Sequence, residues 1–284
     1  MKRANTSKLN SQTITASDSA RVPVPVSVIV PCYNEEESIA YLARSLDQLQ
    51  MELAGEYCVQ LILIDDGSQD DTWQLLNYHF GSRADALLIR HDQNRGVAAA
   101  IATGLEHSHE IACSLDCDCS YDPRELKPML GLLVEGVDLV VASPYHPKGR
   151  VCNVPEWRIG LSRSASWLYR IVTGSRLHTF TSCFRVYRRS TALATPLQYS
   201  GFLGIAELTG RFVLDARAIV EHPAPLEGRL FGRSKMRIPS TIKGHLQLLA
   251  SLAWSRLMRA RSSELLPTAA EPPAVYQAKT PTVP

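Results

Sequence analysis

An apolar run passes directly into an acidic turn in the stretch Gln60-Leu-Ile-Leu-Ile-Asp-Asp-Gly-Ser-Gln-Asp-Asp-Thr72. A short continuous apolar run of this kind is typical of a strand buried on both faces of a parallel sheet. Asp71 stands where it can cap a helix that follows the turn. We therefore interpret this stretch as a buried strand with acidic side chains at its carboxyl end, leading into a helix.

The same pattern recurs through the first half of the chain. Short runs rich in Val, Ile and Leu predict five strands, at Val26–Val30, Gln60–Ile64, Ala86–Ile89, Ile111–Leu115 and Asp138–Ala142. Helix-compatible spacing occupies the intervening stretches 36–54, 71–80, 95–108 and 123–135, the last opened by Asp122-Pro123. Regular alternation of strands and helices predicts an α/β fold with a Rossmann-like wound sheet, mostly parallel, and helices on both faces.

The second half is less regular. Trp157 to Thr173 predicts a helix, Thr179 to Arg188 one or two strands, and Phe212 to Pro223 another strand. From Ile238 apolar residues recur every three or four positions, with Lys243, Arg259 and Arg261 beside them: Ile238, Ile242, Leu246, Leu249, Ala253 and Leu257. This partly amphipathic C-terminal helix has three interpretations: packing on the domain, contact with a membrane interface, or dimerisation.

Composition narrows the class of protein. The chain has 284 residues and a formal net charge of +2, which is too even a balance for a nucleic-acid binder. Its seven cysteines are an odd number, as expected for reduced thiols in a cytoplasmic protein. We find no signal peptide and no apolar stretch long enough to span a membrane, so we expect a cytoplasmic protein that can reach the inner face of the membrane.

These patterns predict one domain between two tails. Residues 1–22 form a basic N-terminal tail and residues 263–284 a Pro-rich one, both with the composition of disordered segments. We assign 23–237 to the folded domain and 238–262 to the C-terminal helix.

Acidic residues follow three of the predicted strands. They occur in Pro31–Glu36, in Asp65–Thr72 and in Asp116-Cys117-Asp118. Ligands of open α/β sheets bind outside the carboxyl ends of the strands, where these clusters would meet. Asp116 and Asp118 are two residues apart, so in an extended segment both carboxylates point to the same side. Such hard oxygen ligands suit Mg²⁺ or Mn²⁺ shared with substrate phosphates.

Several motifs resemble a known family. The N-terminal ones are Val28-Ile-Val-Pro-Cys-Tyr-Asn-Glu-Glu36, Ile64-Asp-Asp-Gly-Ser-Gln-Asp-Asp-Thr72, Asn94-Arg-Gly96 and Leu115-Asp-Cys-Asp118. They resemble the inverting GT-A glycosyltransferases of family 2, which use nucleotide sugars. The later segments Trp157-Arg158, Ser162-Arg163, Ser182–Arg189 and Arg229–Lys235 look like the dolichol-phosphate mannosyltransferase and polyprenyl-phosphate glycosyltransferase branch.

The resemblance implies roles for individual residues. Pro31, Tyr33 and Glu35 would frame the nucleoside, Asp65 or Asp66 would read the base, and Arg95 would lie near the nucleotide. Asp116 and Asp118 would hold the Mg²⁺ or Mn²⁺ ion, with Ser120 where some relatives place a glutamine ligand. Arg229, Ser234 and Lys235 would close over the phosphates. The catalytic residues that the resemblance implies are Asp118, Arg229, Lys235 and Glu207. A cation and a guanidinium can both stabilise the charge that builds up on a departing diphosphate.

Two positions depart from the family pattern. Many relatives have Ser-Arg-Tyr after the fifth strand, where the arginine helps to hold phosphate. Here Pro144 takes its place, with Lys148 or Arg150 as nearby substitutes. Where many relatives have an aspartate before Ser182, this chain has Thr179. Glu207 aligns with a family glutamate and could be a general base or could orient a loop.

The resemblance therefore implies an inverting transfer of a hexose from a GDP- or UDP-sugar. The expected acceptor is a polyprenyl phosphate, and the expected lipid contact is the helix 238–262. The alternatives are a hydroxyl acceptor on a glycan or small molecule, and a nucleotide-sugar-binding protein without turnover. A dinucleotide-dependent oxidoreductase is disfavoured because no G-x-G-x-x-G motif follows the first strand.

Overall fold

The computed structural model describes residues 22–228 and 238–264, and its centre is a seven-stranded sheet in the order β3-β2-β1-β4-β7-β5-β8. Its strands are β1 (Val24–Cys32), β2 (Tyr57–Asp65), β3 (Ala86–Arg90), β4 (Ile111–Ser114), β5 (Leu139–Ser143), β7 (Arg185–Arg188) and β8 (Ile219–Pro223). Every neighbouring pair is parallel except those of β7, which runs antiparallel to both β4 and β5. The short strands β6 (Arg150–Cys152) and β9 (Pro225–Glu227) form a separate two-stranded sheet. The predicted α/β class with a mostly parallel sheet is confirmed.

The reversed strand β7 decides what lies beside the carboxyl ends of β4 and β5. Because β7 runs antiparallel, its amino-terminal end shares a sheet edge with those carboxyl ends. The segment 179–184, which enters β7, therefore lies next to the turn that follows β4. The sequence predicts one or two strands over Thr179–Arg188, and only the part from Arg185 onward is a strand.

Helices cover both faces of the sheet, as predicted. They are α1 (Glu36–Leu53), α2 (Thr72–Phe80), α3 (Val97–Glu106), the 3₁₀ turn η1 (Pro123–Glu125), α4 (Leu126–Leu132), α5 (Glu156–Thr173), α6 (Arg189–Leu193), α7 (Phe202–Leu214) and α8 (Ile238–Glu264). Asp122 caps η1 by accepting a hydrogen bond from Arg124 N, with Pro123 at the first position. Asp71 occupies the position before α2, but Asp70 is the residue that accepts the hydrogen bond from Thr72 N.

Alternation along the central strands builds two cores. Val26, Val28 and Val30 of β1 belong to the cluster that includes α1, α2 and α4, whereas Ile29 belongs to the cluster that includes α3, α6 and α7. Successive side chains of a strand point to opposite faces, so each strand contributes to both cores. All of these β1 residues are fully buried, which explains why the strands read as continuous apolar runs.

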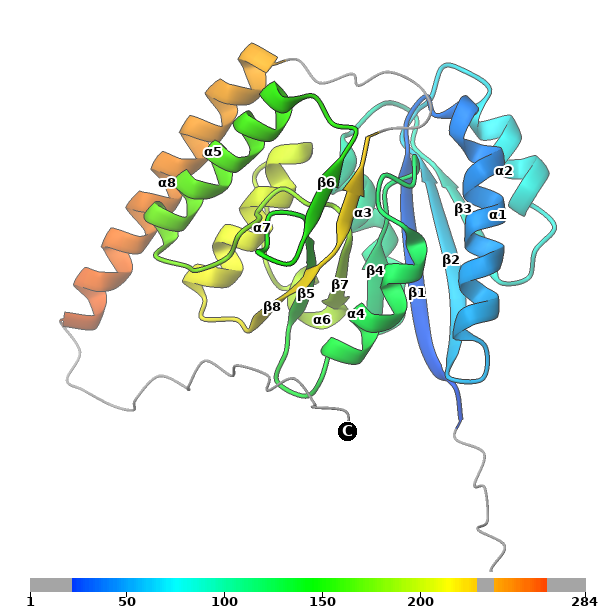
Figure 1. Cartoon of the computed structure of the whole chain (residues 1–284), viewed down its shortest axis with the longest axis horizontal. Coiled ribbons are helices and arrows are strands. Elements are labelled where there is room, and N and C mark those ends of the chain that lie inside the picture. The colour runs from blue at the N-terminus through cyan, green and yellow to red at the C-terminus, as the bar shows by residue number, and fades with distance from the viewer. Residues whose placement is uncertain (1–21, 229–237, 265–284) are drawn as a thin grey trace, which may run out of the picture.

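A third cluster joins α5, α7 and α8. It contains Tyr169, Phe180, Ala206, Leu248, Leu249 and Leu252. Figure 1 shows α5 and α8 side by side along one edge of the molecule, with α7 between them and the sheet. A side chain on Gly210 would collide with Leu252, and one on Gly244 would collide with Leu203, so two glycines permit this close packing of α8 on α7.

Two expectations for this half were wrong. The predicted strand Phe212–Pro223 is the end of α7 followed by β8, which begins at Ile219. Residues 204 to 210 of α7 are all buried, so exposed and half-buried positions occur only at the two ends of this helix. The apolar stripe predicted for α8 is not the face that packs on the domain. Leu249 is buried, but Ile242, Leu246, Ala253 and Leu257 are exposed, and the packing face also includes Leu248 and Leu252.

Candidate active site

The loops that follow β1 and β2 are joined into one rim. Asn34 N donates to Ser68 Oγ at 2.9 Å, and Gln69 N donates to Asn34 Oδ1 at 2.7 Å. Glu35 N donates to Thr72 Oγ1 at 2.8 Å. The two motifs that sequence places at adjacent strand ends are therefore in direct contact.

Asp66 is buried and holds the loop before α3 in place. Only 3% of the residue is exposed, and its carboxylate accepts hydrogen bonds from Arg95 N at 2.9 Å and Gly96 N at 2.7 Å. His91 Nδ1 lies 2.7 Å from the same carboxylate. Gly96 has φ +97°, and a side chain there would collide with the backbone of Ser200, which explains the glycine. This geometry supports a positioning role for Asp66.

Asp65 is fully buried and is paired with Arg90. Arg90 Nε lies 3.0 Å from Asp65 Oδ2, and Ser68 N donates to Asp65 Oδ1 at 3.0 Å. Pro31, Tyr33 and Glu35 are half-buried on the same rim.

Asp116 and Asp118 lie in a tight turn, and the extended geometry assumed from their spacing is wrong. Cys119 N donates to Asp116 O at 3.1 Å, which closes the turn. Asp118 Oδ1 accepts hydrogen bonds from Ser120 N at 3.0 Å and Ser120 Oγ at 2.7 Å. Ser120 therefore orients the Asp118 carboxylate, which is only 4% exposed. The turn still brings both aspartates to one cavity.

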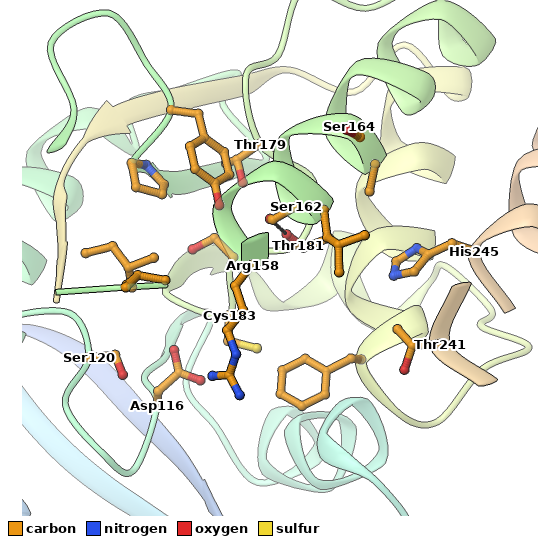
Figure 2. A pocket seen from close by; sticks show the side chains of 18 of the residues that line it. Asp116, Ser120, Arg158, Ser162, Ser164, Thr179, Thr181, Cys183, Thr241 and His245 are labelled. Carbon is orange, nitrogen blue, oxygen red and sulfur yellow. Dashed lines mark hydrogen bonds between the residues drawn. The ribbon is translucent and has the colours of Figure 1, made fainter. Parts of the chain in front are cut away.

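That cavity has a volume of about 450 Å³ and two chemically different ends. One end contains Asp116, Asp118, Ser120 and Arg158. Figure 2 shows Asp116 and Ser120 at this end, with the Arg158 side chain reaching toward Asp116. The other end is apolar and is lined by Leu161, Ala165, Leu168, Phe202, Ile242, Leu246 and Leu249. The cavity thus links charged groups at the sheet edge to an apolar surface between α5, α7 and α8.

Arg158 provides the cation of this cavity. It comes from the first turn of α5, and its Nε is buried without a hydrogen-bond partner among the described residues. Its guanidinium carbon lies 5.2 Å from the centre of the Trp157 ring. The substitutes suggested by sequence, Lys148 and Arg150, are not among the described residues that line the cavity.

Both positions that depart from the family pattern line the cavity. Pro144 and Thr179 form adjacent parts of its wall, held together by Glu221 of β8. Glu221 Oε1 accepts hydrogen bonds from Ser143 Oγ at 2.7 Å, His178 N at 2.8 Å and Thr179 N at 3.1 Å. Its Oε2 lies 2.8 Å from His178 Nδ1. A carboxylate from β8 therefore fixes the wall at the place where the resemblance leads one to expect an aspartate.

Glu207 lies apart from this cavity. It is 1% exposed, and its Oε2 accepts hydrogen bonds from Gln198 N at 2.8 Å and Tyr199 N at 3.0 Å. Its Oε1 pairs with Arg211 at 2.7 Å. Oε2 thus holds the loop before α7 and Oε1 is paired within the helix, which supports the loop-orienting interpretation over a general base.

Other predicted residues lie elsewhere. Arg95 is exposed and lines a different cavity, of about 410 Å³, between α3, α6 and α7. Arg229, Ser234 and Lys235 lie outside the described residues.

Burial keeps neutral several groups in the cavity wall. Burial raises the pKa of the Cys183 thiol, and the nearby Asp116 carboxylate raises it further. Burial also raises the pKa values of Tyr121 and Tyr145. These side chains therefore stay protonated at neutral pH, and among the described lining residues the carboxylates and the guanidinium are those of Asp116, Asp118 and Arg158.

The donor set at Asp116 and Asp118 fits a cation that arrives with a ligand. Across residues 22–228 and 238–264, no group of three or more His, Cys, Asp and Glu side chains is placed to hold a metal ion. Mg²⁺, however, is commonly held by one or two carboxylates together with substrate phosphates. Two carboxylates at the end of an open cavity match that requirement.

The structure reveals three site residues that sequence reasoning did not assign: Arg158, Glu221 and His245. Arg158 belongs to a motif that carried the resemblance, so a signal existed for it. Glu221 and His245 reach the site from β8 and α8, and no local pattern marks them. In the described part of the chain, no helix is long and apolar enough to cross a bilayer.

Comparison with known proteins agrees with this geometry. Residues 27–193 match the family described as Glycosyl transferase family 2. Polyprenol monophosphomannose synthase of Mycolicibacterium smegmatis is 30% identical over 217 residues, which cover 74% of this chain and 80% of that protein. Undecaprenyl-phosphate mannosyltransferase of Micrococcus luteus is 28% identical over 218 residues, covering 74% of this chain and 87% of that protein.

A solved structure shares the fold. Glucosyl-3-phosphoglycerate synthase from Mycobacterium tuberculosis, in complex with Mn²⁺, UDP and glucosyl-3-phosphoglycerate, superposes with a TM-score of 0.61 at 21% identity. The match covers 88% of this chain and 86% of that one, and it confirms the predicted GT-A fold. With the family match extending from β1 to α6, the chain belongs to glycosyl transferase family 2.

Proposed function

We propose that this protein is an inverting glycosyltransferase that moves a hexose from a nucleoside-diphosphate sugar to a polyprenyl phosphate. The observation that carries the proposal is the two-ended cavity, which joins an acidic turn and a guanidinium to an apolar surface. The names of the relatives, a polyprenol monophosphomannose synthase and an undecaprenyl-phosphate mannosyltransferase, support the same acceptor class.

The acidic end suits the donor. Asp116 and Asp118 would hold Mg²⁺ or Mn²⁺, which would screen the charge of the diphosphate as it leaves. Ser120 keeps the Asp118 carboxylate in place through its two hydrogen bonds. The rim formed by Asn34, Ser68 and Thr72 lies at the ends of neighbouring strands and would receive the nucleoside.

Arg158 suits the acceptor phosphate. A buried Nε donor without a partner is costly unless a ligand completes its hydrogen bond, and guanidinium binds phosphate strongly. Arg158 lies at the charged end of a cavity that continues to the apolar end, so a phosphate bound to it would carry its hydrocarbon chain toward Leu168 and Leu246.

The carboxylates that line the cavity favour a phosphate over a hydroxyl acceptor. Among the described residues, Asp116 and Asp118 are the only acidic ones in its wall. A hydroxyl would need a general base to become a good nucleophile, whereas a phosphate is already ionised. In the transfer, a phosphate oxygen forms the new bond to the anomeric carbon, and the bond to the diphosphate breaks with its electron pair leaving on the nucleotide.

Helices α5 and α8 would bring the site to a lipid surface. Trp167 and Trp254 are 59% and 63% exposed, and Leu246 is 57% exposed at the cavity mouth. Exposed tryptophans with neighbouring basic residues such as Lys243 are typical of helices that lie in a membrane interface.

Co-sedimentation with vesicles tests this contact. The double variant Trp254→Ser with Leu246→Ser should bind vesicles containing anionic lipid less than the wild type does. Met51→Ser is the matched control, because Met51 is 69% exposed on α1 at a distance from α8 in Figure 1. Equal vesicle binding by all three proteins would contradict a membrane contact through α8.

Transfer of label to the organic phase tests the function. The purified protein is incubated with polyprenyl phosphate and labelled GDP- or UDP-hexose, with Mn²⁺, with Mg²⁺ or with EDTA. Extractable label that requires the metal supports the proposal and identifies the donor. Nucleotide release without extractable label would point to a hydroxyl acceptor, and donor binding without turnover would point to a binding protein.

A further inference from the structure

The geometry points to His245 of α8 as a second contact for the acceptor phosphate, in the wall of the cavity that Arg158 also lines. The inference rests on the proposed lipid-phosphate acceptor and assigns to α8 a direct part in binding it. Three observations carry it: the position of His245 in the cavity wall, its fixed orientation, and the protonation state that this orientation imposes.

Tyr169 fixes the orientation of the His245 ring. Tyr169 is fully buried in α5, and its hydroxyl lies 2.8 Å from His245 Nδ1. Burial raises the pKa of Tyr169, so the phenol keeps its proton. A buried phenol needs an acceptor for its proton, and among the described contacts His245 Nδ1 is the one within reach, so we assign the hydroxyl as the donor.

The protonation state of His245 follows from this bond. Burial lowers the pKa of His245, which is therefore neutral at pH 7. A neutral imidazole carries one proton, and with Nδ1 accepting from Tyr169 that proton resides on Nε2. His245 is thus a hydrogen-bond donor at Nε2 and is not available there as a base.

The Nε2 edge belongs to a polar belt inside the cavity. Figure 2 shows the His245 ring pointing from α8 into the cavity, on the side opposite Asp116, with Thr241 one helical turn before it. On the α5 side, Arg158 and Ser162 line the same space. A phosphate that enters this cavity offers oxygen acceptors to a neutral N–H donor in its wall, and the apolar residues of α8 beside His245 suit the attached hydrocarbon.

Other contacts already hold α8 against α5 and α7, so the Tyr169–His245 hydrogen bond is not needed for that purpose alone. Arg256 Nη1 donates to Val172 O at 2.9 Å, and Arg259 Nη2 lies 2.5 Å from Asp215 Oδ1. Leu248 and Leu252 are buried against α5 and α7. The helix is therefore anchored without His245, which leaves its cavity-facing nitrogen to act on a ligand.

Binding of a short acceptor pair tests the inference with the full chain. We would measure the dissociation constants of farnesyl phosphate and of farnesol for the wild type and for His245→Ala. Loss of a donor to a charged group should raise the constant for farnesyl phosphate about 10-fold or more and leave that for farnesol nearly unchanged. His245→Gln, which retains an N–H at a similar reach, should recover part of the loss, and Tyr169→Phe should show an intermediate loss.

The outcomes separate this inference from the proposed function. Equal losses for farnesyl phosphate and farnesol, or no loss for either, would overturn the role of His245 while wild-type binding of farnesyl phosphate stands. A wild type with no preference for farnesyl phosphate over farnesol would contradict the acceptor itself. His107→Ala is the matched control, since His107 is exposed at the end of α3 and bonds only to its own helix among the described contacts.

Discussion

The donor side and the acceptor side of the cavity are built in opposite ways. On the donor side, each functional cluster is a short segment directly after a strand, and backbone hydrogen bonds to Asp65, Asp66 and Asp118 lock those segments. On the acceptor side, single residues from the turn after β5 and from α5, β8 and α8 are brought together only by the fold, as Pro144, Arg158, Glu221 and His245 are. Local construction leaves a continuous sequence motif, whereas Glu221 and His245 are marked by no local pattern.

The largest effect is expected from Asp118→Asn, which tests the donor side. The amide oxygen can still accept from Ser120 N, so the turn is preserved while the negative charge is lost. We expect kcat to fall about 100- to 1,000-fold because an electrostatic group that acts on the diphosphate is removed. Transfer assays at saturating substrates measure it, with Asp122→Asn as a control outside the cavity lining. Retention of full activity would contradict the assignment of this turn.

Arg158→Ala tests the acceptor side. We expect the KM for polyprenyl phosphate to rise about 10- to 100-fold, since a charge-assisted contact to phosphate is lost. The KM for the nucleotide sugar should stay unchanged if the two sides act separately. Arg170→Ala, on the same helix but outside the cavity lining, is the control. A rise in both KM values would show that the two sides cannot be treated as independent.

Asp66→Asn distinguishes a structural residue from one that reads the base. The NH₂ group of an asparagine at this buried position would face at least one of the three donors that now bond to the carboxylate, at Arg95 N, Gly96 N or His91. That hydrogen bond would be lost. We expect the free energy of unfolding to fall by about 2 kcal/mol. Urea denaturation of this variant and of Asp92→Asn, an exposed neighbour, measures it. Unchanged stability with weaker nucleotide binding would instead assign Asp66 to the nucleoside.

The smallest effect is expected far from both sides, at Asp85. Its pKa is lowered to about 2, chiefly by the hydrogen bond from Arg83, with further help from Gln50. A carboxyl with a depressed pKa stabilises the fold above its unfolded value of about 3.9, and this contribution is lost as the pH falls toward 2. Asp85→Asn should lower stability by under about 1 kcal/mol at pH 7, because the pair is partly exposed.

Comparison of the urea midpoints of the wild type and Asp85→Asn at several pH values checks this prediction. The gap between the two proteins should narrow as the pH falls below 4. A constant gap would show that packing and not charge accounts for the effect.

The sequence predicts the first five strands and the helices between them because each is a self-contained pattern. Buried parallel strands read as apolar runs, and Asp122-Pro123 marks a helix start without reference to the rest of the chain. The helix α7 was not predicted; its residues 204 to 210 are all buried, and only its ends carry exposed or half-buried positions. The short strands β6 and β9 escaped because three-residue strands carry too little pattern.

The residues of the candidate site also differ in how far the sequence predicts them. Sequence places Asp116 and Asp118 at a sheet edge, although their turn geometry depends on Ser120 and Cys119. It could not reveal that Asp66 bonds to residues 91 to 96, or that Glu221 supports Thr179, because these contacts join distant segments. The role of the motif residues in the fold is therefore visible only in the assembled structure.

The reversed strand β7 has a consequence for the order of folding. Its pairing with β4 joins Ile111 to Arg188, so that contact must wait until a long stretch of chain has been brought together. The β1–β2 and β2–β3 pairs close much shorter loops and are expected to form earlier. A partly folded chain would then hold its nucleotide-side strands in order while the segment 179–184 is still unplaced.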